Sequence, residues 1–99
     1  MGNVVDLDTI IKNREMILDK AEEHKIRTIK VFGSVVRGEE KLGSDLDFIV
    51  EFKDDADLFD LIQFKQALED FFGVRVDVVT ENSIHRLIKE EVLKEAIPV

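Results

Sequence analysis

The stretch that decides the fold runs from Gly33 to Asp47 and reads GSVVRGEEKLGSDLD. It ends in two aspartates, Asp45 and Asp47, separated by one leucine. Because a strand repeats every two residues and rises roughly 3.3 Å per residue, the two carboxylates should share one face about 7 Å apart. Two ionised carboxylates this close repel each other unless a cation lies between them. The pattern therefore favours a site for a hard cation such as Mg²⁺.

Working outward, alternation of apolar residues and capping signals predict three strands and three long helices. The strands are expected at Arg27–Phe32, Asp45–Phe52 and Val74–Val79, and the helices at Asp8–Lys25, Leu58–Phe72 and Ile84–Ala96, with Asp8, Asp57 and Ser83 as caps. In the Asp45–Phe52 strand one face is wholly apolar, with Leu46, Phe48, Val50 and Phe52, and the other carries Asp45, Asp47, Ile49 and Glu51. We therefore predict an α+β fold, in which helices pack on one face of a small mixed β-sheet and the site lies on the open acidic face.

A third carboxylate joins the pair if two strands are neighbours. Asp77 stands in mid-strand between Val76 and Val78, on the same predicted face as Arg75. If this strand lies beside the strand of Asp45 in register, three acidic side chains converge. Taken singly, each acidic residue is more often part of a solvated strand face, so the hypothesis rests on the combination.

The start of the deciding stretch suits an anion. Gly33 directly after a strand allows a sharp turn and a close approach of ligand to backbone. Ser34 then offers a hydroxyl and a backbone N–H at the beginning of a turn, and Arg37 can add a cation near the same anion. The plain alternative for the Gly33-Ser34 pair is a helix cap after a strand.

Composition bounds the class of protein. The 99 residues suit a single domain spanning 1–99, and the net charge of −8 disfavours general binding of nucleic acid. The sequence has no cysteine, no visible signal peptide and no apolar run long enough to span a membrane, which suits a cytoplasmic protein.

Together, the Gly33–Gly38 run, the Ser44–Asp47 run and Asp77 resemble the signature of the polymerase-beta-like nucleotidyltransferases. Within that superfamily the chain is most similar to the minimal nucleotidyltransferases, short prokaryotic proteins often paired with HEPN-domain proteins. The arginine and glycine after the Gly-Ser pair match, as does the serine before the two aspartates. Val36 departs from the family's usual small alanine, at a position without a catalytic role.

The resemblance implies a mechanism and a cofactor. Asp45 and Asp47 would hold the magnesium that bridges a nucleoside triphosphate, and Asp77 would complete a second metal site and activate the attacking oxygen. Ser34, with Gly33, would grip the β- and γ-phosphates. Two-metal chemistry suits such a transfer, since one ion assists the attacking hydroxyl and the other the leaving pyrophosphate.

The expected reaction moves a nucleoside monophosphate, AMP from ATP, to a hydroxyl. By resemblance the acceptor is a tyrosine of a HEPN-type toxin, which makes the chain an antitoxin. Two alternatives stay open: an antitoxin that neutralises its partner by contact alone, and a subunit of a small-molecule nucleotidyltransferase. Leu58, Ile62 and Leu68 set the main apolar stripe of the Leu58–Phe72 helix, and Phe59, Phe64 and Phe71 lie off it. These three phenylalanines form either a wide core contact or a partner surface. The loop Glu39–Ser44 is the candidate to close on substrate.

Overall fold

The computed structural model describes residues 4–39 and 45–99, and its N-terminal segment forms two helices where we predicted one. α1 (Leu7–Lys12) and α2 (Arg14–Glu23) meet at Asn13, whose side-chain amide donates to the Thr9 carbonyl at 2.8 Å. The cap is Asp6 rather than Asp8, because the Asp6 carboxylate accepts from the Thr9 amide at 2.8 Å. The side-chain bond at Asn13 competes with helix continuation and explains the break.

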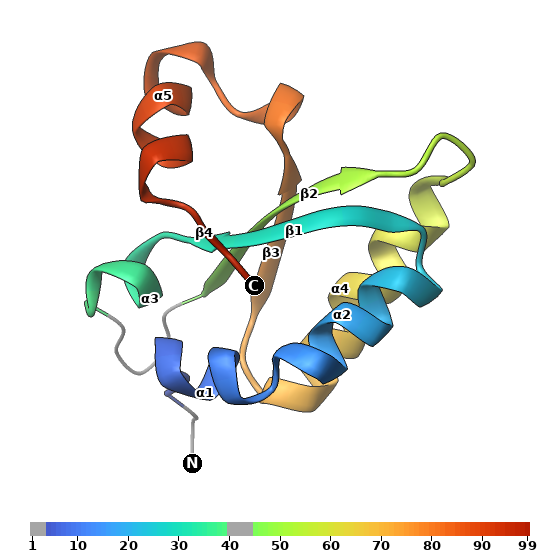
Figure 1. Cartoon of the computed structure of the whole chain (residues 1–99), viewed down its shortest axis with the longest axis horizontal. Coiled ribbons are helices and arrows are strands. Elements are labelled where there is room, and N and C mark those ends of the chain that lie inside the picture. The colour runs from blue at the N-terminus through green and yellow to red at the C-terminus, as the bar shows by residue number, and fades with distance from the viewer. Residues whose placement is uncertain (1–3, 40–44) are drawn as a thin grey trace.

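A mixed sheet follows, as predicted. Its strands among the described residues are β1 (Ile26–Phe32), β2 (Leu46–Phe52), β3 (Val76–Thr80) and β4 (Ile97–Pro98), in the order β3-β2-β1-β4. β2 pairs with β1 antiparallel and with β3 parallel, so β2 lies at the centre (Figure 1).

The short strand β4 was not predicted. Ile97 pairs with Val31 and Pro98 with Lys30, and the Val99 amide donates to the Ile29 carbonyl at 3.2 Å. We predicted three strands, the last at Val74–Val79, and none after the Ile84–Ala96 helix. Proline is compatible with an edge strand, where its missing N–H faces away from the sheet.

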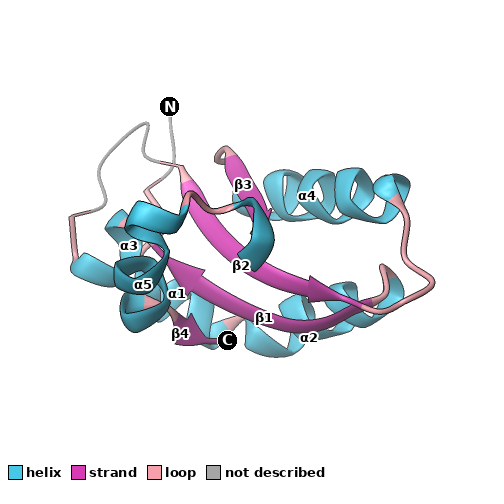
Figure 2. Ribbon diagram, turned by 90° about the horizontal axis from the view of Figure 1, so that it is seen from above, coloured by secondary structure: helices cyan, strands magenta, loops and turns pink. Residues whose placement is uncertain are grey.

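Helices α1, α2 and α4 (Leu58–Phe72) lie on one side of the sheet, which confirms the predicted fold class (Figures 1 and 2). The most deeply buried large side chains come from the sheet and from the helices: Phe48, Val31 and Val50 from the sheet and Ile10, Ile17, Val35, Phe64 and Leu68 from the helices. On β2, Leu46, Phe48 and Val50 enter this core as expected. The opposite face carries Asp47 and Glu51.

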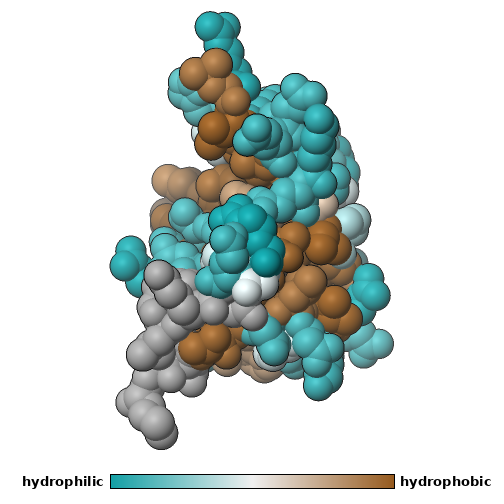
Figure 3. All heavy atoms as spheres, turned by 90° about the vertical axis from the view of Figure 1, so that its left-hand side faces the viewer, coloured by the Kyte–Doolittle hydropathy of each residue, from teal (hydrophilic) through white to brown (hydrophobic). Residues whose placement is uncertain are grey.

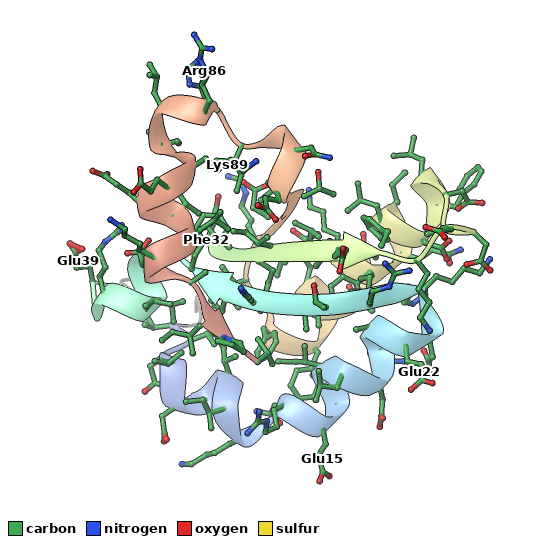
Figure 4. All side chains as sticks on the ribbon, turned by 45° about the horizontal axis from the view of Figure 1, so that its top comes forward. Glu15, Glu22, Phe32, Glu39, Arg86 and Lys89 are labelled. Atoms are coloured by element: carbon green, nitrogen blue, oxygen red, sulfur yellow. The ribbon has the colours of Figure 1, made fainter. Side chains whose placement is uncertain are left out.

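α5 (Arg86–Glu95) stands on the other side of the sheet and leans over the end of β1 (Figure 1). It begins later than predicted, because residues Glu81–Ser83 form a separate 3-10 turn, η1, and His85 caps α5 by accepting from the Leu87 amide at 3.1 Å. Lys89 points from α5 toward η1, where its ammonium lies 3.8 Å from the Glu81 carboxylate (Figure 4). α5 therefore covers one end of the open face of the sheet.

The apolar stripe of α4 was assigned wrongly. Phe64 is fully buried, whereas Ile62, placed on the covered stripe, is 52% exposed. Phe59 is 71% exposed and Phe71 52%, as the partner-surface reading requires. The predicted cap is correct: Asp57 and Asp60 form a reciprocal capping box at 3.0 and 3.1 Å.

Candidate functional site

The three predicted aspartates meet at one end of the open face. Asp47 and Asp77 are direct partners in the parallel β2–β3 pair, and Asp45 immediately precedes β2. The register condition set for Asp77 is therefore met. All three line a single open hollow, together with residues from β1, the turn after it, α3 (Ser34–Arg37), the segment before β3, and α5: Phe32, Gly33, Ser34, Arg37, Arg75, Val92 and Glu95.

Asp47 is the electrostatic centre of this hollow. Burial, followed by the charges of Asp77 and Asp45, raises the pKa of Asp47 from 3.8 to about 6. Arg37 opposes the rise, and Glu95 adds to it. A half-buried carboxylate among like charges is unfavourable when ionised, and a bound cation relieves that cost.

The donor set suits a hard divalent cation, because every candidate ligand is a carboxylate oxygen. Within residues 4–39 and 45–99, however, no three acidic or histidine side chains are already gathered closely enough to enclose an ion. Asp45 is engaged elsewhere, since its carboxylate lies 3.8 Å from Arg75 Nε. Ligation by all three aspartates would therefore need side-chain rotation, for which Asp77 is free enough at its exposed position.

Gly33 lies directly against Asp47. Its φ of 87° and ψ of −155° belong to a backbone region that only glycine adopts readily. A β-carbon at this position would overlap the Asp47 carboxylate and come within 3.2 Å of its Cγ. The sharp turn after β1 and the acidic site thus depend on the same glycine, and Ser34 follows at the start of α3 on the edge of the hollow.

Arg37 also lies at the hollow, but two carboxylates hold it. Its Nε donates to Glu39 at 2.6 Å and its Nη1 to Glu95 at 2.7 Å. Figure 4 shows Glu39 beside α3 and Phe32 at the end of β1 next to α5. Glu95 also accepts a bond from the Gly33 amide at 3.3 Å.

Sequence reasoning missed Glu95 and Val92. The only signal was the pair Ile97 and Val99 on either side of Pro98, which is too short to identify a strand. Two further predictions, Ser44 as part of the motif and the closing loop Glu39–Ser44, fall mainly on residues 40–44, outside the described residues. None of the helices described is long and apolar enough to cross a membrane.

Comparison with known sequences gives a consistent assignment. The profile of the "Nucleotidyltransferase domain" family matches residues 13–99. A candidate protein adenylyltransferase of Methanocaldococcus jannaschii is 44% identical over 77 residues, which are 78% of this chain and 83% of that protein. Protein adenylyltransferase MntA of Thermococcus cleftensis is 41% identical over 78 residues, 79% of each chain.

Solved structures agree with the fold. One described as a candidate minimal nucleotidyltransferase superposes with a TM-score of 0.83 at 43% identity, over 96% of this chain and 97% of the other. A toxin–antitoxin complex with AMP-PNP contains a chain that superposes with a TM-score of 0.71 at 24% identity, over 87% of this chain and 71% of that one, and shows a shared fold. By fold, sequence profile and close relatives, the chain belongs to the nucleotidyltransferase domain family.

Proposed function

We propose that this chain transfers AMP from ATP to a hydroxyl group of a partner protein, with magnesium as cofactor. The observation that carries the proposal is the Asp47–Asp77 register pair, which lines one hollow with Asp45 and with Gly33 and Ser34. Acidic ligands beside a glycine-serine turn can serve the two ends of a metal–triphosphate complex. Use of ATP, which is available in the cytosol, also suits the cytoplasmic location that we propose.

The residues divide the work by position. Asp45 and Asp47 would hold magnesium, and Asp77 would join them at a second ion. When bound, magnesium supplies charge neutralisation for the triphosphate and for the leaving pyrophosphate. Gly33 and Ser34 orient the phosphates by backbone and hydroxyl contacts.

Asp77 is exposed on the edge strand β3, which gives the acceptor a route to it. The acceptor oxygen forms a bond to the α-phosphorus while the bond to the pyrophosphate oxygen breaks. The hydroxyl proton passes to the Asp77 carboxylate and then to solvent. Exposure keeps Asp77 in contact with water, which can carry that proton away.

The proposed acceptor is a tyrosine of a HEPN-domain toxin, and the chain would act as its antitoxin. Support comes from a relative 41% identical, a protein adenylyltransferase called MntA, and from the fold shared with chains of toxin–antitoxin complexes. The exposed aromatics Phe59 and Phe71 on α4 offer a surface for such a partner.

The test uses two labels. The chain is incubated with magnesium, the HEPN-type product of the neighbouring gene and ATP labelled at either the α- or the γ-phosphate. Transfer of AMP puts α-label, and no γ-label, on the partner. Asp47→Ala should abolish labelling, while the exposed control Asp19→Asn should retain it. Replacing the labelled tyrosine by phenylalanine identifies the acceptor.

A contact-only antitoxin is the second candidate, favoured by the exposed α4 aromatics. It predicts that the double variant Asp45→Ala/Asp47→Ala still neutralises the toxin and that Phe59→Ser does not. α-label on a small molecule with none on the partner would instead support a small-molecule nucleotidyltransferase subunit. Partner protein that stays unlabelled while the toxin is neutralised contradicts the proposed reaction.

A further inference from the structure

Glu95 bridges the two groups that sequence analysis assigned to phosphate binding. One carboxylate oxygen accepts from the Gly33 amide at 3.3 Å, and the other accepts from Arg37 Nη1 at 2.7 Å. The Glu95 side chain is only 20% exposed, although it sits at the rim of an open hollow. A carboxylate on a backbone N–H and a guanidinium makes the same contacts that a phosphate oxygen pair would make.

The fold fixes Glu95 in this place. β4 pairs with β1 so that Ile97 faces Val31 and Pro98 faces Lys30. Continuing that antiparallel register by two residues puts Glu95 opposite Gly33. As the last residue of α5, Glu95 is held by the helix on one side and by the edge strand on the other. The backbone topology therefore places the Glu95 side chain beside Gly33.

Resting on the proposed function, we infer that Glu95 is a built-in occupant of the phosphate subsite, which the triphosphate must displace to bind. Three negatively charged groups, the Asp47 carboxylate, the Glu95 carboxylate and the incoming triphosphate, cannot share this space without cost. Displacement releases the Gly33 amide and Nη1 of Arg37 to the phosphates, while Nε of Arg37 stays on Glu39. It also removes the side-chain bond between the end of α5 and the turn after β1, while the β4–β1 pairing remains. Triphosphate binding is thereby coupled to the position of α5. Anions that bind too weakly to displace Glu95 are kept out of the phosphate subsite.

A positioning role is the rival explanation. In that case Glu95 would stay in place and hold Arg37 in the direction that the phosphates need. The two roles predict opposite signs for neutralisation of the side chain. Displacement predicts tighter binding when the carboxylate becomes an amide, whereas positioning predicts weaker binding.

The experiment measures equilibrium binding of ATP with magnesium, and of inorganic triphosphate with magnesium, to the full chain. Glu95→Gln should bind both ligands at least about fivefold more tightly, since a charge-assisted contact no longer has to be broken. The control Glu91→Gln, an exposed glutamate on the same helix, makes the same change in net charge and should leave both affinities unchanged. Adenosine, which lacks phosphates, should bind wild type and Glu95→Gln equally.

A second measurement uses the wild-type protein alone. The ¹³C resonance of the Glu95 side-chain carboxyl and the Gly33 amide resonance should both shift when inorganic triphosphate with magnesium is added. The inference is overturned if Glu95→Gln binds no more tightly than wild type, or if Glu95→Gln and Glu91→Gln gain equally. It is also overturned if the Glu95 carboxyl signal does not move at saturation, or if neither wild type nor Glu95→Gln binds. Wild type that binds ATP but transfers no label would refute the proposed reaction and leave the inference standing.

Discussion

The Asp47 carboxylate occupies the space that a side chain at position 33 would need. A β-carbon on Gly33 would overlap that carboxylate, and the glycine's φ of 87° is itself unfavourable for other residues. The turn after β1 therefore packs directly against Asp47, near the start of β2. This contact brings the predicted phosphate and metal groups into one site, and it makes the turn sensitive to a single methyl group.

Gly33→Ala should destabilise the fold and abolish nucleotide binding. Strained backbone and overlap together should cost about 2–4 kcal/mol in the free energy of unfolding. Gly38→Ala is the matched control, because Gly38 also has a positive φ, 72°, but a β-carbon there meets nothing within 4 Å. Gly38→Ala should cost only about 1 kcal/mol, measured by urea unfolding.

The overlap can be separated from backbone strain by a double-mutant cycle. In an Asp47→Ala background, Gly33→Ala should cost less than in the wild type, since the carboxylate is gone. Equal costs in the two backgrounds would show that the contact with Asp47 is not the cause.

Asp47 should make stability depend on pH. Because its folded pKa is raised to about 6 from 3.8, the folded state holds the proton more tightly than the unfolded chain. Stability contributed by this proton is present at about pH 4 and is lost as the pH rises through about 6. Asp47→Asn removes that loss and should be more stable than wild type at pH 7 by about 1–2 kcal/mol, a figure reduced for the side chain's partial exposure.

The measurement is urea unfolding of wild type and Asp47→Asn at several pH values between 4 and 7.5. The difference in the free energy of unfolding should grow across this range, and other carboxylates cancel in the comparison. A constant difference from pH 4 to pH 7.5 would contradict the raised pKa.

Magnesium with ATP should raise the melting temperature, because a ligand that binds only the folded state stabilises it. At 100 times its dissociation constant the gain is about 2.7 kcal/mol, which is a shift of roughly ten degrees or more for a chain this size. Asp47→Ala and Asp77→Asn should lose most of the shift, and Asp19→Asn should keep it. If no ribonucleotide with magnesium moves the wild-type melting temperature, the assignment of the site is wrong.

The convergence of the three candidate aspartates was easier to predict from sequence than the helices around them. Asp45, Asp47 and Asp77 follow from strand alternation, a local rule that fixes which face a residue takes. Glu95 could not be found in the same way. Its position depends on β4, a strand of two residues that is stabilised by pairing with β1, and β1 lies far away in the sequence. Asn13 broke a helix that propensity alone would have continued, through a side-chain bond to the Thr9 carbonyl.

The prediction of which α4 residues are buried was wrong for a related reason. Leu58, Ile62 and Leu68 were assigned to one covered face, yet the helix packs Phe64, Leu68 and Phe72 inward. An apolar helix with residues on several sides offers more than one stripe, and tertiary contacts select among them. α5 also has apolar residues that are not covered, since Leu87 and Ile88 are exposed at its start. Figure 3 shows hydrophobic atoms at the surface near the upper end of the molecule.

That choice of stripe is testable with two phenylalanines five residues apart on α4. Phe64 is fully buried and its ring lies 6.3 Å from that of His24, so Phe64→Ala should leave a cavity and cost about 3–5 kcal/mol in the free energy of unfolding. Phe59 is 71% exposed, and Phe59→Ala should change stability by no more than about 0.5 kcal/mol. Urea unfolding of both variants decides it. Similar costs would mean that Phe59 also packs inward in solution, and the α4 surface would then lose the aromatic residue on which its role in partner binding most depends.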